Sequence, residues 1–397
     1  METDIYVVEP RDTPVGIACK LGIPVIQLIN LNALPPSEPL VVGQALLVPR
    51  RRKLIESFGY FQLYNLDDLA GTLAEIGRFF SLGGLFEFPV TSGGAFVIPE
   101  GVDVDRAVAL LRFYQIRPQM TITNLTATGF DRDLARAVIS DPALKRRVIR
   151  NLLFLLRRYR FSGVNVDFEM VYPEDRELFS DFIRDLKIAL GPAGYEVIAT
   201  VPVKNSDDPT NPNAGAYDYR AIGQWADLVF IMAYDWGYMG GPPRAVAPID
   251  EIRKALAYAV TQIPPAKIIQ GIPLYGYNWQ LPYEPGNRTT RAVNLVAAID
   301  LARQHRAEIQ YDPTAQSPYF RYTDAEGAEH IVWFEDARSV QAKYETARDF
   351  NLGGIGFWSS RNSPYGFRQN WEIFDQVFEV RQSNPCDLRN GPNPIPI

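Results

Sequence analysis

The amino-acid sequence predicts an α/β protein. It consists of a (β/α)8 barrel, or TIM barrel, with a small α+β insertion before its eighth strand, and a small βααβ unit in front. From residue 55 onward, short apolar runs alternate with amphipathic helical stretches, and about eight such repeats suit a closed barrel. A doubly wound open sheet is the competing fold. No Gly-x-Gly-x-x-Gly fingerprint follows an early strand, which weakens that alternative.

The small unit covers residues 4–49. Its predicted elements are a strand at 4–9, helices at 12–23 and 24–32, and a closing strand at 40–49. Asp12 or Thr13 can cap the first helix, and Pro14 suits its first turn. A basic linker at 50–54 follows, which we interpret as a solvated connection.

The barrel is predicted to span residues 55–382. Its expected strands are residues 56–61, 77–82, 118–123, 162–169, 195–201, 227–234, 267–275 and 353–358. Two of the intervening helices, at 141–159 and 173–190, carry clear start signals or an apolar stripe.

The gap before the last predicted strand is too long for one helix. It contains a helical stretch at 293–305 and a hairpin turn at Asp324–Gly327, so we expect a small α+β insertion at about 288–345. Residues 383–397 form a tail rich in Pro and Asn.

Composition limits the classes of partner. The chain has 397 residues, a formal net charge of -6 and a pI of about 5.2, which argues against nucleic acid as a partner. No run of about 18 apolar residues is present, so we expect no transmembrane helix. The start, METDIYVVEP, lacks the basic and apolar regions of a signal peptide. We therefore expect a protein that stays where it is made or reaches its target by another route.

The small numbers of cysteines and histidines limit the kinds of catalytic and metal site that the chain can form. Cys19 and Cys386 lie at opposite ends of the chain, which excludes a disulfide framework and a thiolate zinc site. His305 and His330 are the only histidines, and neither has a nucleophile-like context. We therefore expect no metal and no cofactor, and catalysis by carboxylates and tyrosines.

One predicted strand, SGVNVDFE, carries two acids and an amide on one face. Val164, Val166 and Phe168 suit the side that meets the helices, which turns Asn165, Asp167 and Glu169 into the barrel. Buried carboxylates cost several kcal/mol unless they are paired or hydrogen-bonded, so this face indicates a site. A satisfied internal polar network is the alternative.

The direction of this strand suggests roles for the two acids. Glu169 comes last, nearest the carboxyl end of the strand, where barrel active sites lie. Burial and the neighbouring Asp167 both raise the pKa of its carboxyl group, so Glu169 can serve as a general acid. Protonation of a glycosidic oxygen is the reaction that such a group suits best.

The small unit resembles a LysM domain, the module that binds N-acetylglucosamine polymers in peptidoglycan and chitin. The residues that carry the likeness are Tyr6, Val8, Asp12, Thr13, Ile17, Ala18, Leu28, Asn30, Asn32, Leu40, Val42, Gly43, Gln44, Leu47, Val48 and Pro49. Arg11 replaces the usual Gly, and Pro14 stands where Leu is common.

The barrel resembles glycoside hydrolase family 18, the chitinase and endo-N-acetylglucosaminidase family. GVNVDFE is similar to its Asp-Gly-x-Asp-x-Asp-x-Glu signature, and FIMAYDWG, GIPLYGYNW and GGIGFW match later strands in the expected order. The insertion and the LysM-like unit resemble one branch, the spore cortex-lytic N-acetylglucosaminidases of endospore formers. That branch also lacks a signal peptide. The likeness implies a location in the spore coat, cortex or cell wall, or otherwise in the cytoplasm.

The resemblance implies substrate-assisted catalysis with retention of configuration. Glu169 would protonate the leaving oxygen, Asp167 would accept a hydrogen bond from the acetamido N–H of the substrate, and Tyr234 would align the acetamido oxygen. Substrate contacts are implied for Asn165, Asp235, Trp358, Trp236, Tyr275, Tyr277 and Trp279, and barrel or loop packing is the alternative for the last four.

Two positions depart from the family signature. Ser162 replaces the leading Asp, and Asn165 replaces the first Asp of the inward face. Because Asn165 cannot share a proton, we expect Asp167 to stay ionised and to face Glu169.

The predicted activity is cleavage of β-1,4 bonds after N-acetylglucosamine in peptidoglycan, with spore cortex as the expected substrate. Both the barrel cleft and the LysM-like unit would bind this polysaccharide. Two alternatives remain open, a chitinase or endo-N-acetylglucosaminidase on other polymers, and a lectin that binds aminosugars without cleaving them. A lectin of this family typically lacks the acid, which is present here.

Overall fold

The computed structural model describes residues 3–35, 39–49, 52–286, 289–358 and 368–382. The expected tail at 383–397 and the first part of the expected linker lie outside these ranges.

The small unit has the predicted strand–helix–helix–strand order. It contains strand β1 (Thr3–Val7), helices α1 (Pro14–Leu21) and α2 (Val25–Leu31), and strand β2 (Ala45–Pro49), with β1 antiparallel to β2. Thr13 caps α1 by accepting a hydrogen bond from the amide of Gly16. Its core consists of Val8, Ile17, Ala18, Leu28, Leu34, Leu46 and Val48. Within the described residues no single helix is long and apolar enough to cross a membrane, although the bent pair α1 and α2 meets that test together.

Eight parallel strands form a closed barrel, as predicted. They are β3 (Lys53–Gln62), β4 (Leu82–Pro89), β5 (Arg117–Thr123), β8 (Gly163–Asp167), β9 (Glu196–Pro202), β10 (Leu228–Met232), β11 (Ile268–Pro273) and β17 (Gly354–Trp358). Pairing of β17 with β3 closes the ring. The short strand β18 (Phe378–Val380) extends the amino end of β3.

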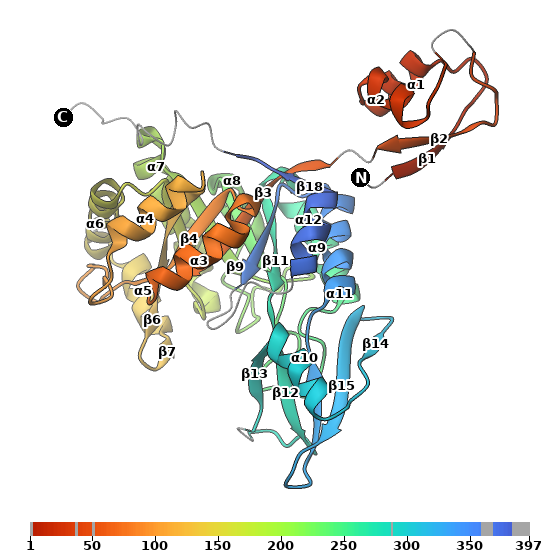
Figure 1. Cartoon of the computed structure of the whole chain (residues 1–397). Coiled ribbons are helices and arrows are strands. Elements are labelled where there is room, and N and C mark those ends of the chain that lie inside the picture. The colour runs from red at the N-terminus through yellow and green to blue at the C-terminus, as the bar shows by residue number, and fades with distance from the viewer. Residues whose placement is uncertain (1–2, 36–38, 50–51, 287–288, 359–367, 383–397) are drawn as a thin grey trace.

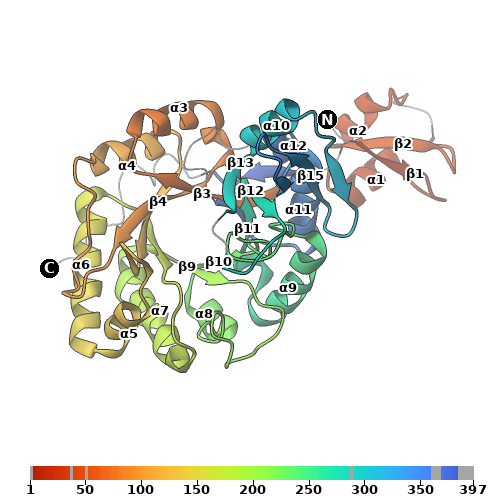
Figure 2. The same ribbon diagram turned by 90° about the horizontal axis from the view of Figure 1, so that it is seen from below.

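Helices surround the strands on all sides (Figure 2). They are α3 (Leu66–Ile76), α4 (Val104–Phe113), α5 (Arg132–Ser140), α6 (Pro142–Tyr159), α7 (Arg176–Leu190), α8 (Tyr219–Trp225), α9 (Ile249–Gln262), α11 (Ala337–Asp349) and α12 (Arg368–Val377). Asp141 caps α6 through the amides of Ala143 and Leu144. The apolar stripe of α7 is buried, as expected from its spacing.

The second barrel strand was misplaced by the sequence interpretation. Residues 77–79 form a 3-10 helix instead of strand, and β4 begins at Leu82. Two glycines at the start of β4 concealed the strand, because glycine has a low strand propensity. Gly84 is required there, because an added Cβ would lie 2.7 Å from the Phe58 ring.

The insertion is a five-stranded antiparallel sheet with one helix. Its strands are β12 (Tyr275–Leu281), β13 (Arg291–Asn294), β14 (Gln310–Asp312), β15 (Ser317–Thr323) and β16 (Glu329–Trp333), and its helix is α10 (Leu295–Gln304). The predicted turn at Asp324–Gly327 joins β15 to β16. The sheet starts at Tyr275, earlier than the expected boundary near 288, because β12 pairs with β13 and β16.

The insertion and the small unit lie at opposite ends of the barrel (Figure 1). The insertion follows the carboxyl end of β11, whereas the small unit precedes the amino end of β3. The insertion therefore stands beside the barrel mouth where active sites are built.

Candidate active site

Strand β8 presents its polar side chains to the barrel interior, as its alternation predicted. The Phe168 ring packs outward on Phe182 of α7, with ring centroids 5.6 Å apart. On the inner face, Asn165 Nδ2 donates to Tyr60 Oη (3.0 Å), and Thr200 Oγ1 donates to Asn165 Oδ1 (2.9 Å). Tyr60 and Thr200 are 2.8 Å apart, so the three groups form a closed ring of hydrogen bonds.

Asn165 has no exposed surface, because it lies one layer below the barrel mouth. Both ends of its amide are engaged by Tyr60 and Thr200. The implied contact between Asn165 and substrate does not fit this placement. For this residue the closed ring of hydrogen bonds fits the alternative of a satisfied polar network.

Asp167 occupies the next layer outward and is 3% exposed. Burial and the negative charge of Glu87 raise the pKa of its carboxyl group to about 7. Among the described residues, Asp167 Oδ1 has no hydrogen-bond partner. The expectation that Asp167 stays fully ionised overlooked Glu87, which comes from β4 instead of β8.

Glu169 follows the last residue of β8, at the rim of the barrel. Asn124 holds its backbone twice: the Glu169 amide donates to Asn124 Oδ1, and Asn124 Nδ2 donates to the Glu169 carbonyl, both at 2.9 Å. Tyr217 Oη donates to the carbonyl of Phe168 (2.8 Å). Burial, with the charges of Asp167 and Asp235, raises the pKa of Glu169 well above its usual range. The surroundings therefore favour the protonated form of the Glu169 carboxyl, on a backbone that Asn124 and Tyr217 hold in place.

Tyr234 and Asp235 follow β10 and face the same mouth. Tyr234 is buried, and burial raises the pKa of its phenol well above the usual range, so the phenol remains a donor. Asp235 Oδ1 accepts hydrogen bonds from Tyr275 (2.7 Å) and Tyr277 (3.3 Å), which belong to the insertion strand β12. Asp235 has a left-handed backbone (φ 62°), which Asp tolerates better than most residues.

The predicted aromatic residues divide into two groups. Trp358, at the end of β17, is partly buried and packs edge-on against Tyr60 and Phe86, at 5.0 and 4.9 Å between ring centroids. Trp279 is fully buried, and its Nε1 donates to the carbonyl of Gly241 (2.9 Å). A side chain without exposed surface cannot contact a sugar, so the predicted substrate contact of Trp279 does not fit the structure.

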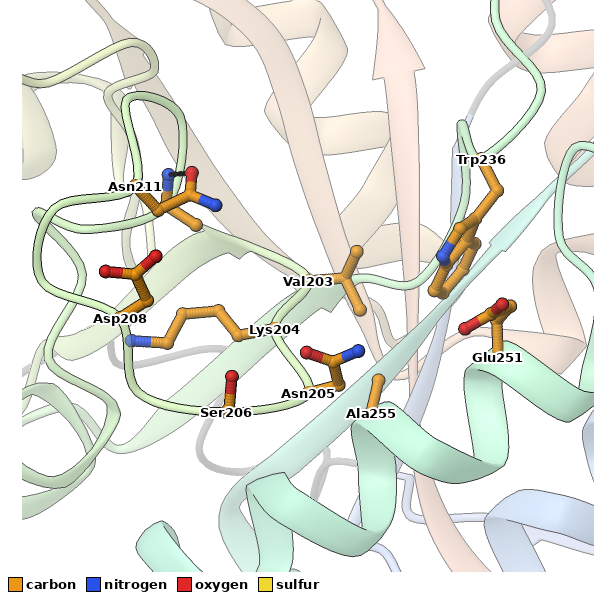
Figure 3. A pocket seen from close by; sticks show the side chains of 10 residues that line it. Val203, Lys204, Asn205, Ser206, Asp208, Asn211, Trp236, Glu251 and Ala255 are labelled. Carbon is orange, nitrogen blue, oxygen red and sulfur yellow. Dashed lines mark hydrogen bonds between the residues drawn. The ribbon is translucent and has the colours of Figure 1, made fainter.

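Trp236 borders a pocket of about 300 Å³ on the carboxyl side of β9 (Figure 3). The other lining residues are Val203, Lys204, Asn205, Ser206, Asp208, Asn211, Ala214, Glu251 and Ala255. Lys204 Nζ is held by Asp207 Oδ1 and the Tyr217 carbonyl, both at 2.8 Å. The pocket offers the amides of Asn205 and Asn211, the Ser206 hydroxyl and the carboxyls of Asp208 and Glu251 beside an indole, a polar lining that suits a ligand rich in hydroxyl groups.

Sequence reasoning missed three residues that shape this site: Tyr60, Glu87 and Asn124. Tyr60 and Asn124 lie on or after strands that were correctly predicted, and only their inward direction was unassigned. Glu87 lies in the strand that was misplaced. No group of three or more His, Cys, Asp or Glu side chains in the described ranges is arranged to hold a metal ion.

A (β/α)8 barrel with two buried carboxyls at its mouth, both with raised pKa, is the arrangement of a glycosidase. Comparison with known families agrees, because residues 132–362 match the glycosyl hydrolases family 18 model and residues 6–49 match the LysM domain model. The chain belongs to glycosyl hydrolases family 18 and carries an amino-terminal LysM domain.

Relatives match over nearly the whole chain. The cortical fragment-lytic enzyme of Bacillus subtilis is 37% identical, and the match covers 95% of this chain and 98% of that protein. The crystal structure of the Bacillus cereus spore cortex-lytic enzyme SleL superposes with a TM-score of 0.80 at 36% identity, covering 95% and 87% of the two chains. The crystal structure of a chitinase from Chromobacterium violaceum superposes with a TM-score of 0.74 at 30% identity. The match covers 81% of this chain and 98% of the chitinase chain.

Proposed function

We propose that this glycosidase cleaves β-1,4 bonds after N-acetylglucosamine in spore-cortex peptidoglycan, with retention of configuration. The observation that carries the proposal is the buried carboxyl of Glu169 at the barrel rim, where burial and the neighbouring Asp167 raise its pKa. The names of the relatives that match over the whole chain support cortex as the substrate.

In the proposed mechanism, Glu169 gives its proton to the glycosidic oxygen as the bond to the anomeric carbon breaks. The acetamido oxygen of the substrate attacks that carbon and forms an oxazolinium ion. Asp167 accepts a hydrogen bond from the acetamido N–H and offsets the positive charge, while Tyr234 donates to the acetamido oxygen. Water then opens the ring, and Glu169 takes back a proton. Two displacements at the same carbon retain its configuration.

The cleft residues are proposed to hold the sugar chain around these groups. Trp358 would stack under the sugar at the cleavage point, and Asp235 would hydrogen-bond to it, with Tyr275 and Tyr277 fixing the carboxylate of Asp235. Trp236 and its pocket would take the neighbouring unit of the chain.

Trp358→Ala is expected to lower kcat/KM about tenfold, which corresponds to about 1.4 kcal/mol of lost binding to the transition state. Trp358→Phe keeps a ring on the same backbone and should recover part of that loss. Initial rates on soluble cortex fragments measure both variants. Equal rates for Trp358→Ala and the wild type would remove Trp358 from the sugar site.

The LysM domain is proposed to anchor the enzyme on insoluble glycan. A pocket of about 530 Å³ lies in its loop before β2, lined by Leu34, Pro35, Pro39, Leu40, Val41, Val42, Gly43 and Gln44. Val41 and Val42 are 69% and 59% exposed there, so apolar surface is available to a sugar face. This anchoring supports a location in the spore cortex or cell wall.

Val41→Asp is expected to weaken retention on insoluble cortex about tenfold, because ligand binding would bury a carboxylate in an apolar pocket. Ile26→Asp is the matched control, since Ile26 is 61% exposed on α2 and lies outside the pocket. Co-sedimentation with purified cortex measures retention, and rates on soluble fragments should stay unchanged. Equal loss in both variants would argue against this pocket.

The second candidate function is a chitinase, or an endo-N-acetylglucosaminidase on other polymers, favoured by the likeness to the Chromobacterium chitinase. A lectin is the non-catalytic alternative. Mass spectrometry of products from cortex, vegetative wall and chitin oligomers incubated side by side separates the three. Fragments ending in reducing N-acetylglucosamine from cortex alone support the proposal. The same ends from chitin favour the chitinase, and no products favour the lectin.

A further inference from the structure

Strand β4 contains an irregularity at the level of the catalytic carboxyls. Leu85 is paired with Met120 and Phe88 with Ile122, so two residues of β4 oppose the single residue Thr121 of β5. This is a β-bulge, a device that redirects side chains and is common beside active sites. The two extra residues are Phe86 and Glu87.

The bulge turns both residues of this pair toward the barrel mouth. In a regular strand Phe86 and Glu87 would face opposite sides. Here the Phe86 ring packs inward on Tyr60 and Trp358, while Glu87 Oε1 accepts a hydrogen bond of 3.5 Å from Tyr64, just beyond the end of β3. Glu87 is 8% exposed, so a second carboxyl is nearly buried here, and its negative charge acts on Asp167.

The strand register places Glu87 between the two inner layers of β8. Thr121, opposite the bulge, is paired with Asn165, and Thr123 is paired with Asp167. A nearly buried Glu on an inner face is unusual, because removing a carboxylate from water is costly. The neighbour of Asp167 on its own strand, Asn165, cannot exchange a proton, whereas Glu87 can.

We propose that Glu87 is a positioning residue that governs when Asp167 carries its negative charge. Two buried carboxyls whose charges interact titrate as a pair, so a negative charge on Glu87 makes the ionisation of Asp167 harder. This inference rests on the proposed function, since it assumes that ionised Asp167 supports the acetamido group.

Other titratable groups also face this pair. They are Tyr60 from β3, Tyr64 after β3, Glu169 after β8, Tyr217 before α8, and Tyr234 and Asp235 after β10. Burial raises the pKa of the Tyr60, Tyr217 and Tyr234 phenols and of the Glu169 carboxyl, which favours their neutral forms. Glu87 is the group whose charge acts on Asp167, which agrees with the raised pKa of that carboxyl.

The test is the pH profile of kcat/KM on soluble cortex fragments. Its acid limb reports protonation of Asp167 in the free enzyme. In Glu87→Gln we expect that limb to move to lower pH by roughly one unit, because a neighbouring negative charge is removed. A role in folding alone would lower activity evenly at every pH.

Glu379→Gln is the matched control. Glu379 is exposed on β18, at the opposite end of the barrel, and its loss should leave the profile unchanged. In the double variant Glu87→Gln with Asn165→Asp, a carboxyl again lies beside Asp167, two residues before it on β8. We expect the acid limb to move back to higher pH.

Three outcomes decide the inference. An acid limb that stays in place in folded Glu87→Gln overturns it, while the wild-type product pattern continues to support the proposed function. If Glu87→Gln does not fold, Glu87→Asp is measured instead, because it keeps a carboxyl at a changed distance from Asp167. A displaced acid limb in Glu87→Asp supports the inference, and an unmoved acid limb overturns it. A wild type that makes no reducing N-acetylglucosamine ends removes the proposed function and this inference with it.

Discussion

Glu169→Gln is expected to lower kcat on cortex fragments by about 10³-fold or more, because the amide cannot give a proton to the leaving oxygen. Binding of a thiazoline that mimics the oxazolinium intermediate should remain, since Asp167 and Tyr234 are untouched. The backbone contacts that Asn124 makes to residue 169 do not involve the substituted side chain. The variant should therefore fold like the wild type.

Reducing ends released from cortex measure the loss in Glu169→Gln, and calorimetry with the thiazoline measures binding. Glu379→Gln, the same chemical change at the far end of the barrel, serves as the control and should keep full activity. Turnover within tenfold of the wild type would show that another group supplies the proton. Loss of thiazoline binding together with turnover would instead indicate a disrupted site.

Asp167→Asn is expected to affect activity and stability in opposite directions. Removing the charge that offsets the oxazolinium ion should lower kcat by roughly 10²- to 10³-fold. The same change should stabilise the folded protein at pH 8. Burial and Glu87 raise the pKa of Asp167 from 3.8 to about 7, so ionising this carboxyl in the folded state costs free energy that the unfolded chain does not lose.

Because the pKa of Asp167 is raised in the folded state, the loss of stability appears between the unfolded and the folded pKa values. Well below pH 3.8 the Asp167 carboxyl is neutral in both states and costs nothing. As pH rises from 4 to 7 the unfolded chain ionises and the folded chain resists, so wild-type stability falls, and above 7 the cost is constant. Denaturant unfolding at pH 4.5 and pH 8 should show an advantage for Asp167→Asn that grows to a few kcal/mol. An equal difference at both pH values would contradict the burial of an uncompensated charge.

Local patterns in the sequence were sufficient for the fold, the family and the inward face of one strand. Alternation along SGVNVDFE correctly assigned the inner face of β8, and the order of landmarks along the chain led to the family that the comparisons show. These signals depend only on neighbouring residues, because the side-chain period of a strand is two. The burial of Asn165 and Trp279 could not be predicted from the sequence, because burial depends on segments that are far away in the chain.

Glu87 shows the limit of such patterns most clearly. The strand that contains Glu87 begins with two glycines, so its start was not recognised in the sequence. A bulge then breaks the alternation that would otherwise show which way the Glu87 side chain points. A bulge is defined by the partner strand, so residues 82–89 alone do not reveal it.

The sequence by itself determined the two domains, the eight-stranded barrel and the acidic inner face of its fourth strand. Periodicity and spacing encode these features locally. Only the tertiary structure decided which groups share the barrel mouth. It joined Glu87 to Asp167, Asn124 to Glu169 and the insertion tyrosines to Asp235. Closing the barrel brings distant strands within reach of one another, and their charges then set the protonation that the chemistry requires.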